Sequence, residues 1–308
     1  MSDIVLQQKK ENQNTTAPAI RAYLGGSFDP VHNGHLQMAM YVYQHLFPIA
    51  KQQQRALQVS LLPNARSPFK DKSTNPEHRL AMLKRATQES PLQISELELW
   101  QTPPVYTIDS VRTLRQRYPN DRLIFIMGMD SARSLDKWKD GLRLTDYVDL
   151  WIFNRGGSSA HKNNLLNMGE NLVEDESTTQ AIADLQSQLQ VQLPIQLQSK
   201  MIHSPTELVT PATPTQADNK VLQSTHQGRI YIDARPVLAI SSTQLRQQLH
   251  KTAHRVNILP AAETQITSIP SINDIISNNA PNSFAKWLNP AVYQYIIAHQ
   301  LYSAAQFR

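Results

Sequence analysis

The chain has 308 residues, enough for one large α/β domain or two modest ones, and its 40% hydrophobic content can form a substantial core. It contains no cysteine, which excludes disulfides and thiolate metal sites and fits a cytoplasmic location. The formal net charge of +5 comes from scattered Lys and Arg residues, so a nucleic acid and a phosphate-bearing small molecule remain equally open as partners.

The beginning of the chain does not resemble a secretion signal. In residues 1–19 the apolar run Ile4-Val5-Leu6 is short and is followed by charged residues, so we expect a disordered tail there. The longest apolar stretches, such as 123–129, fall well short of the about 20 residues that cross a bilayer. We therefore expect no membrane partner.

From residue 20 onward, strand-like apolar runs alternate with segments of helical spacing. Strands are predicted at 22–26, 57–62, 92–99, 123–128, 149–153 and 229–232, and helices at 34–47, 76–87 and 107–118. Continuous apolar runs are typical of strands that are buried in a parallel sheet. The alternation predicts an α/β fold: a Rossmann-like, doubly wound parallel sheet with helices on both faces.

Two polar segments interrupt this rhythm. Residues 156–227 are rich in Gln, Ser, Thr, Asn and Pro, with one weak helical stretch at 179–189, and residues 251–288 are similarly polar. Because such compositions bury little apolar surface, we interpret both as insertions or mobile loops, and expect the first to be dispensable for activity. The predicted organisation is a domain formed by 20–155 and 228–250, with a packing helix in 289–308.

A loop rich in glycine and histidine separates the first predicted strand from the first helix. It reads Gly25-Gly26-Ser27-Phe28-Asp29-Pro30-Val31-His32-Asn33-Gly34-His35. Its glycines permit close approach of a ligand, and a helix start offers unpaired N–H groups. His32 and His35 can both donate to anionic oxygens, so the loop predicts a phosphate site. An Asn-Gly turn and a metal site are the alternatives, although no nearby carboxylate completes a zinc site.

A second motif, Ile240-Ser241-Ser242-Thr243-Gln244-Leu245-Arg246, opens a later helix. Ser241 and Gln244 have the spacing of a capping box. Capping leaves Arg246 unexplained, and this residue lies near enough to the helix start to hold a second phosphate cluster. Taken by itself, Arg246 is better explained as part of a solvated helix face.

Together the two motifs resemble the nucleotidylyltransferase superfamily, whose signature is a histidine, any residue, glycine, histidine loop after the first strand. The wider pattern is similar to the bacterial nicotinate-mononucleotide adenylyltransferases, over residues 22–155, 229–246 and 289–302. This resemblance implies an enzyme of NAD biosynthesis that joins ATP and nicotinate mononucleotide to give nicotinate adenine dinucleotide and pyrophosphate. It also implies that Mg²⁺ enters bound to ATP.

The resemblance assigns roles to individual residues. ATP binding falls on Gly25, Gly26, Ser27, Phe28, His32, Gly34, His35, Ser241, Ser242, Thr243 and Arg246, with His32, His35 and Arg246 as catalytic groups. Mononucleotide binding falls on Lys70, Tyr106, Thr107, Asp130, Trp138 and Arg155. One position departs from the family pattern, because Phe69 stands where the family usually has a histidine, so any substrate contact from that histidine is missing.

The mononucleotide residues also have physical interpretations of their own. Thr107 fits a helix N-cap, and the amides after it suit the carboxylate of nicotinate. Asp130 follows a parallel strand, where it can bind ribose hydroxyls or, equally, cap the next helix. Trp138 can stack on a pyridine ring or pack in the core. Lys70 and Arg155 can neutralise phosphates, although isolated charges of this kind usually lie on the surface.

The residue inventory predicts a reaction without a protein nucleophile. A phosphate monoester has a second pKa of about 6, so the mononucleotide phosphate is ionised enough at neutral pH to attack the α-phosphorus of ATP directly. Catalysis then depends on positioning and on charge stabilisation by the histidines and Arg246. The motif loops offer no carboxylate cage for Mg²⁺.

Other functions fit the sequence less well. Pantetheine-phosphate adenylyltransferases and cytidylyltransferases share the histidine loop without this Trp138 and Arg155 pattern, and class I aminoacyl-tRNA synthetases need a lysine-rich signature and RNA-binding domains. A regulator without catalysis is disfavoured because both histidines and Arg246 are retained. A nucleic-acid binder is disfavoured because basic residues are not clustered with aromatic ones.

Overall fold

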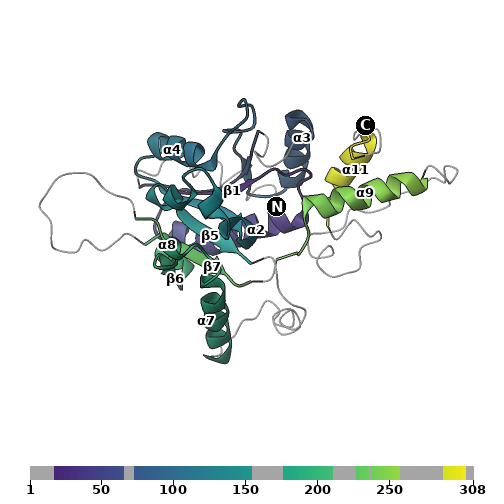
Figure 1. Cartoon of the computed structure of the whole chain (residues 1–308). Helices are drawn as coiled ribbons and strands as arrows, with labels where there is room; N and C mark the ends of the chain where they lie inside the picture. The colour runs from purple at the N-terminus through teal and green to yellow at the C-terminus, as the bar shows by residue number, and fades with distance from the viewer. Residues whose placement is uncertain are drawn as a thin grey trace, which may run out of the picture.

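The computed structural model describes residues 17–65, 73–154, 176–210, 227–235, 237–256 and 287–302. Their strands form a seven-stranded sheet in the order β3-β2-β1-β4-β5-β7-β6, and every neighbouring pair is parallel. The strands are β1 (Ile20–Gly26), β2 (Leu57–Pro63), β3 (Gln93–Ile94), β4 (Arg122–Gly128), β5 (Asp149–Phe153), β6 (Met201–Ile202) and β7 (Ile230–Asp233). The predicted doubly wound parallel sheet is confirmed (Figure 1).

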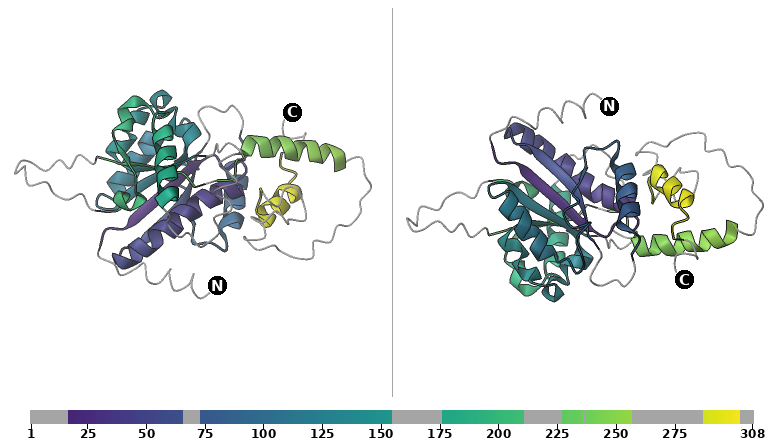
Figure 2. Two further views of the ribbon diagram at one scale, coloured as in Figure 1. Left: turned by 90° about the horizontal axis from the view of Figure 1, so that it is seen from below. Right: turned by 90° about the horizontal axis from the view of Figure 1, so that it is seen from above.

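Helices cover both faces of the sheet (Figure 2). They are α2 (Asn33–Gln52), α3 (Pro76–Thr87), α4 (Thr107–Arg117), α5 (Met129–Ala132), α7 (Glu176–Gln190), α8 (Ile195–Gln198), α9 (Ser242–Val256) and α11 (Pro290–Ala298). The short 3-10 helices are η1 (Leu135–Lys137), η2 (Gly141–Asp146) and η3 (Pro205–Leu208). Among the described residues, no helix is long and apolar enough to span a membrane.

Strand β4 shows how the sequence divides the core into two layers. Ile124 and Ile126 point into the cluster formed with α2, α3, α9 and α11. Leu123, Phe125 and Met127 point into the cluster formed with α4, α7 and α8. Side chains of a strand alternate between its faces, so a continuous apolar run fills both layers at once.

Residues 176–210 differ from the mobile insertion that their composition predicts. They form α7, α8, η3 and strand β6, which pairs with β7 at Met201 and Ile202. Leu189, Leu193 and Leu197 are buried against one layer of the core, and Leu208 against the other. The interpretation as a mobile loop was wrong because a few buried leucines, spread over α7, α8 and the turn between them, pack an otherwise glutamine-rich segment on the core. Deleting the segment would remove an edge strand and part of the core.

Two aliphatic residues of α8 test this conclusion. Leu197 is 1% exposed and Ile195 is 76% exposed. We expect Leu197→Ala to lower the free energy of unfolding by about 2–5 kcal/mol, because it leaves a cavity in the core. Ile195→Ala is expected to change it by less than about 0.5 kcal/mol. Chemical denaturation measures both changes. Equally small effects would show that residues 176–210 do not contribute to the core.

Other boundaries shift for local reasons. Only Gln93–Ile94 of the predicted strand 92–99 pairs in the sheet, and the chain then turns at 97–101 toward the Pro103-Pro104 pair, which supplies no N–H donors for a ladder. Helix α9 extends to Val256, into the predicted polar loop, and residues 257–286 lie outside the described residues. Helix α11 packs through Val292 and Ile296, as predicted.

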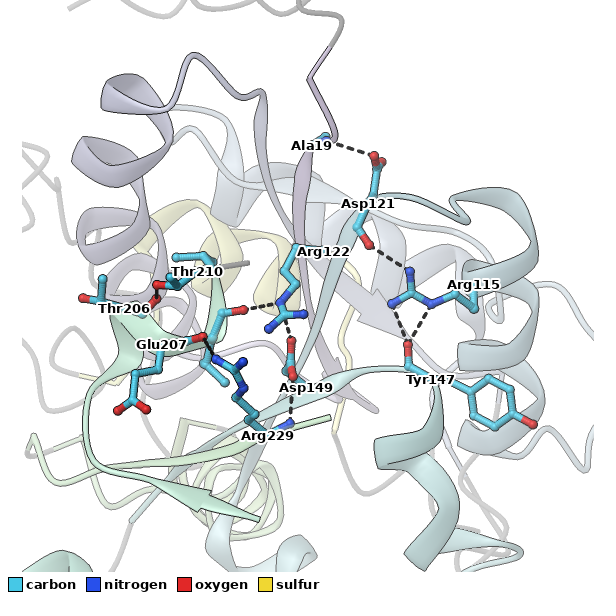
Figure 3. Close-up of polar contacts among 12 residues, drawn as sticks. Ala19, Arg115, Asp121, Arg122, Tyr147, Asp149, Thr206, Glu207, Thr210 and Arg229 are labelled. Carbon is cyan, nitrogen blue, oxygen red and sulfur yellow. Dashed lines mark hydrogen bonds and ion pairs between the residues drawn. The ribbon is translucent and has the colours of Figure 1, made fainter. Parts of the chain in front are cut away.

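The amino ends of the central strands are joined by a buried polar cluster (Figure 3). Asp149 is fully buried, pairs with Arg122 Nε at 2.9 Å and accepts the backbone N–H of Arg229 at 2.8 Å. Burial raises the pKa of Asp149 to about 6, although Arg122 opposes the shift. Arg115 adds two bonds to the Tyr147 carbonyl. This cluster fastens β4, β5 and β7 at the edge that does not carry the motif loops.

Candidate active site

The motif loops follow the carboxyl ends of the central strands. Strands β1 and β4 are neighbours, but the chain continues from β1 to β2 on one side and from β4 to β5 on the other. Such a reversal of strand order opens a crevice at the carboxyl edge, which is where open α/β sheets bind ligands. The loop that starts at Gly25 lies directly at this crevice.

Two positions of the loop require glycine because neighbouring side chains of the protein leave little room for a Cβ. A Cβ at Gly25 would overlap the Phe125 ring, and one at Gly26 would lie 3.2 Å from the Phe28 ring. Phe28 is fully buried with a left-handed φ of 47°, a conformation that non-glycine residues rarely adopt. The rings of Phe125 and Phe28 therefore pack closely against the backbone of the loop, so Phe28 acts as a packing residue.

The two histidines lie together, as the sequence predicts. Their rings stack with centroids 3.6 Å apart, and His32 and His35 are only 2% and 6% exposed. The backbone N–H of His32 donates to His35 Nδ1 at 3.3 Å. Since Nδ1 accepts, a neutral His35 carries its proton on Nε2, which makes Nε2 the donor of this ring.

The start of α2 offers fewer free amides than predicted. The N–H of Asn33 donates to the Trp287 carbonyl at 2.8 Å, and the N–H of His35 donates to the His32 carbonyl at 2.9 Å. These groups are the ones that a helix start would otherwise present to an anion. Side chains therefore carry more of the anion-binding capacity here than the sequence suggests.

The start of α9 confirms the predicted capping box. The Ser241 N–H donates to Gln244 Oε1 at 3.0 Å, and the Gln244 N–H donates to Ser241 Oγ at 3.2 Å. This reciprocal pair fixes the helix start, from which Arg246 projects one turn later.

Residues of α9 hold the histidine loop directly. Arg246 is half-buried and donates to the Asp29 carbonyl at 2.5 Å and to Thr243 Oγ1 at 3.2 Å. The Ser242 hydroxyl donates to the Pro30 carbonyl at 2.9 Å. The interpretation of Arg246 as a solvated surface residue is therefore wrong, because its guanidinium bridges the two motifs.

Gly34 has a similar role in joining the motifs. A Cβ there would approach the Leu238 carbonyl to 3.0 Å, and Gln37 Oε1 accepts the Leu238 N–H at 2.9 Å. The first turns of α2 thus pack against the segment leading to α9, which places residues more than 200 positions apart in one site.

Sequence reasoning missed a buried arginine beneath the loop. Arg79 of α3 is fully buried and donates to four backbone carbonyls, those of Ser27, Asn64, Ala65 and Thr74, at 2.5–3.1 Å. It therefore joins the loop after β1 to the loop after β2. The sequence around Arg79 gives no signal of this role, because all four acceptors are backbone atoms, whose positions residue identity does not reveal.

A cavity of about 630 Å³ opens beside the loop. Its walls include Gly25, Gly26 and Ser27 together with four of the predicted mononucleotide residues, Tyr106, Thr107, Asp130 and Trp138. Trp138 also packs on the core, as one of its two interpretations predicts, and stacking on a pyridine ring stays a prediction. The volume is in the range of small-molecule sites.

Two predicted capping roles are wrong. The N-cap of α4 is Tyr106, so Thr107 is the first helical residue and presents its own N–H at the helix start. The N-cap of α5 is Gly128, and Asp130 lies within the first turn with an exposed side chain on the cavity. Its exposed carboxyl group is therefore open to contact with a ligand.

The cavity is also lined by two lysines that lie far from Tyr106 in the sequence. Lys137 and Lys139 both line it. Lys139 Nζ lies 4.5 Å from the centroid of the Tyr106 ring and 3.1 Å from Asp109 Oδ2. A cation is thus available near the start of α4, although none occurs in residues 106–110.

Glu98 is a further cavity residue that the sequence analysis did not assign. It is 6% exposed, and burial raises the pKa of its carboxyl group to about 7, although the neighbouring Ser110 hydroxyl opposes the shift. A carboxyl group with a pKa of about 7 is only partly ionised at neutral pH, so it repels an anionic ligand less than a fully ionised one.

The Glu98 pKa predicts a pH-dependent stability. Because the folded pKa lies above the ordinary value of 4.5, the native state loses stability as pH rises from about 4.5 to 7, by on the order of 3 kcal/mol. Glu98→Gln removes this loss, so the unfolding free energy of the variant should rise relative to that of the wild type as the pH increases from about 4.5 to 7. Denaturation at pH 5 and pH 8 measures it, with exposed Glu96→Gln as the control. An advantage that does not change with pH would contradict the assignment.

Three positions of interest lie outside the described residues: Lys70, Arg155 and Phe69. Their predicted roles remain predictions. Within the parts of the chain that the structure describes, no three His, Asp or Glu side chains gather in a way that could hold a metal ion.

Fold and site together define a nucleotidyltransferase. The cytidylyltransferase-like family matches residues 23–248, a span that includes both motifs, and the chain belongs to this family.

Curated relatives narrow the assignment. The chain is 30% identical over 231 residues to a probable nicotinate-nucleotide adenylyltransferase of Psychromonas ingrahamii, covering 74% of this chain and 85% of that one. It is 29% identical over 234 residues to the corresponding protein of Idiomarina loihiensis, covering 75% and 89%. It is 41% identical over 117 residues to the nicotinate-nucleotide adenylyltransferase of Bacillus subtilis, covering 37% and 58%. The chain belongs to the nicotinate-nucleotide adenylyltransferases, nucleotide-binding transferases of NAD biosynthesis.

Proposed function

We propose that the cavity binds nicotinate mononucleotide and that His32, His35 and Arg246 bind the phosphates of ATP. The observation that carries this division is the placement of Arg246, which bonds to the same loop that carries the histidine pair. The cavity walls include the first residues of that loop, so the two proposed subsites adjoin. A mononucleotide phosphate in the cavity can then approach the α-phosphorus of ATP.

Within the cavity, each proposed contact has a matching chemical group. Trp138 offers a ring face for the pyridine, Asp130 offers acceptors for ribose hydroxyls, and Thr107 offers a helix-start amide for the carboxylate. Lys139 adds a cation next to the Tyr106 ring. Lys70 and Arg155 are proposed phosphate contacts on sequence grounds alone.

In this proposal the mononucleotide phosphate attacks in line, a P–O bond forms at the α-phosphorus, and the bond to pyrophosphate breaks. The residues that we assign to catalysis are hydrogen-bond donors, which stabilise charge on the transferring phosphate and on the leaving group. Since the attacking phosphate is already ionised, no residue needs to take its proton. Magnesium enters with ATP as part of the substrate, and a cytoplasmic location remains a prediction.

The test is pyrophosphate release in the presence of ATP and Mg²⁺, with nicotinate mononucleotide, nicotinamide mononucleotide or phosphopantetheine as the acceptor. We expect turnover with the pyridine mononucleotides, nicotinate foremost, and formation of nicotinate adenine dinucleotide. Omission of Mg²⁺ should abolish it. Turnover only with phosphopantetheine, or only with CTP in place of ATP, would overturn the proposal.

A further inference from the structure

The chain segment 287–302, far from the histidine loop in sequence, touches that loop at two points. The Trp287 carbonyl accepts the N–H of Asn33 at 2.8 Å. The Tyr302 hydroxyl donates to Asp29 Oδ1 at 2.7 Å. Between these contacts, α11 packs against α3 in the same core layer as α9 (Figures 1 and 2).

Asp29 takes part in further contacts besides the hydrogen bond from Tyr302. It is 3% exposed, and its second carboxyl oxygen, Oδ2, accepts the N–H of Thr74 at 3.2 Å. Its backbone carbonyl accepts the Arg246 guanidinium at 2.5 Å. Tyr302 therefore holds the side chain of the same residue whose backbone holds Arg246.

The Tyr302 hydroxyl is suited to this fixed role. The side chain is 1% exposed, and burial together with Asp29 raises the pKa of its phenol well above the ordinary value. The phenol therefore stays protonated and donates to the Asp29 carboxyl group. Without this donor, Asp29 Oδ1 would be left with an unmet acceptor in a buried place, and the loop would be free to shift.

We propose that Tyr302 is a positioning residue for ATP: through Asp29 it fixes the backbone carbonyl on which Arg246 docks, and so sets Arg246 relative to His32 and His35. The inference rests on the proposed ATP subsite. The proposal predicts an effect on ATP and not on the mononucleotide, because Tyr302 does not line the cavity assigned to the mononucleotide.

The test is Tyr302→Phe, which removes one hydroxyl and keeps the ring. We expect kcat/KM for ATP to fall on the order of tenfold, while KM for nicotinate mononucleotide changes less than about twofold. The matched control is Tyr295→Phe on α11, which also deletes a hydrogen-bonded hydroxyl, here paired with His78 at 2.9 Å. The control should lose some thermal stability without a selective effect on ATP.

Equal kinetic changes in the two variants, or equal changes for both substrates, would overturn the proposal. A second variant, Asp29→Asn, covers the case in which Tyr302→Phe does not fold. It should show an ATP-selective defect at least as large, because Asp29 also accepts the Thr74 N–H, and the double variant should be no worse than Asp29→Asn alone, since Tyr302 acts through Asp29. ATP binding by calorimetry gives the same comparison without turnover, so failure of the proposed reaction is distinguishable from failure of this inference.

Discussion

Replacement of His35 by alanine is expected to lower kcat by a factor on the order of 10² to 10³. This is the usual effect of removing one preorganised donor to charge that develops in a transition state. Because His35 Nδ1 accepts the N–H of His32, a neutral ring has its proton on Nε2, which is then the donor. Steady-state turnover measured by pyrophosphate release tests the expectation.

Two comparisons make the His35 result interpretable. His45 lies further along the same helix against Trp151, remote from the loop, and His45→Ala should leave turnover within about twofold of the wild type. A thermal melt of His35→Ala close to that of the wild type would show that its loss of activity is not a loss of fold. Near-normal activity of a folded His35→Ala protein would mean that the ring only packs.

The second large effect concerns the choice of substrate. We expect the enzyme to prefer nicotinate over nicotinamide mononucleotide by roughly 10² to 10⁴-fold in kcat/KM. The amides of Thr107 and Ile108 open α4 without intrahelical acceptors, which suits a carboxylate. The NH₂ group of a carboxamide would face these donors, at about 1–3 kcal/mol for each one left unpaired. Equal efficiency on both substrates would refute this.

Lys139 provides a way to separate two sources of that preference. If helix-start amides discriminate, Lys139→Met should lower affinity for both mononucleotides and preserve their ratio. If the Lys139 ammonium group binds the carboxylate instead, the ratio of kcat/KM for nicotinate over nicotinamide mononucleotide should fall toward one. Trp138→Ala is the matched control, because loss of a stacking surface should weaken both substrates without changing their order.

Much of the fold was predictable because local sequence periodicity is a direct consequence of burial. A run such as Leu123 to Met127 is compatible with few environments other than a strand covered on both faces. The two motifs were also readable, since a capping box and a glycine-rich turn each arise from a few adjacent residues. The assignment of His32, His35 and Arg246 to one place followed from resemblance, and the structure brings them together.

Features that depend on distant parts of the chain were not predictable. The four acceptors of Arg79 are backbone carbonyls, which leave no trace in residue identity. Lys139 reaches Tyr106 from a segment about 30 residues later, so a search of the local sequence for cations could not find it. Residues 176–210 misled because average composition hides the spacing of a few buried leucines.

The contact between Tyr302 and Asp29 joins positions 273 residues apart, which has a consequence for biosynthesis. At about 5–20 residues per second, a ribosome adds Tyr302 roughly 14–55 s after it has added Asp29. During that interval the nascent chain carries the histidine loop without Tyr302 or the Trp287 carbonyl. Nucleotide binding should therefore be one of the last properties to appear during translation, and chains stalled before residue 287 should fold their central strands yet fail to retain ATP.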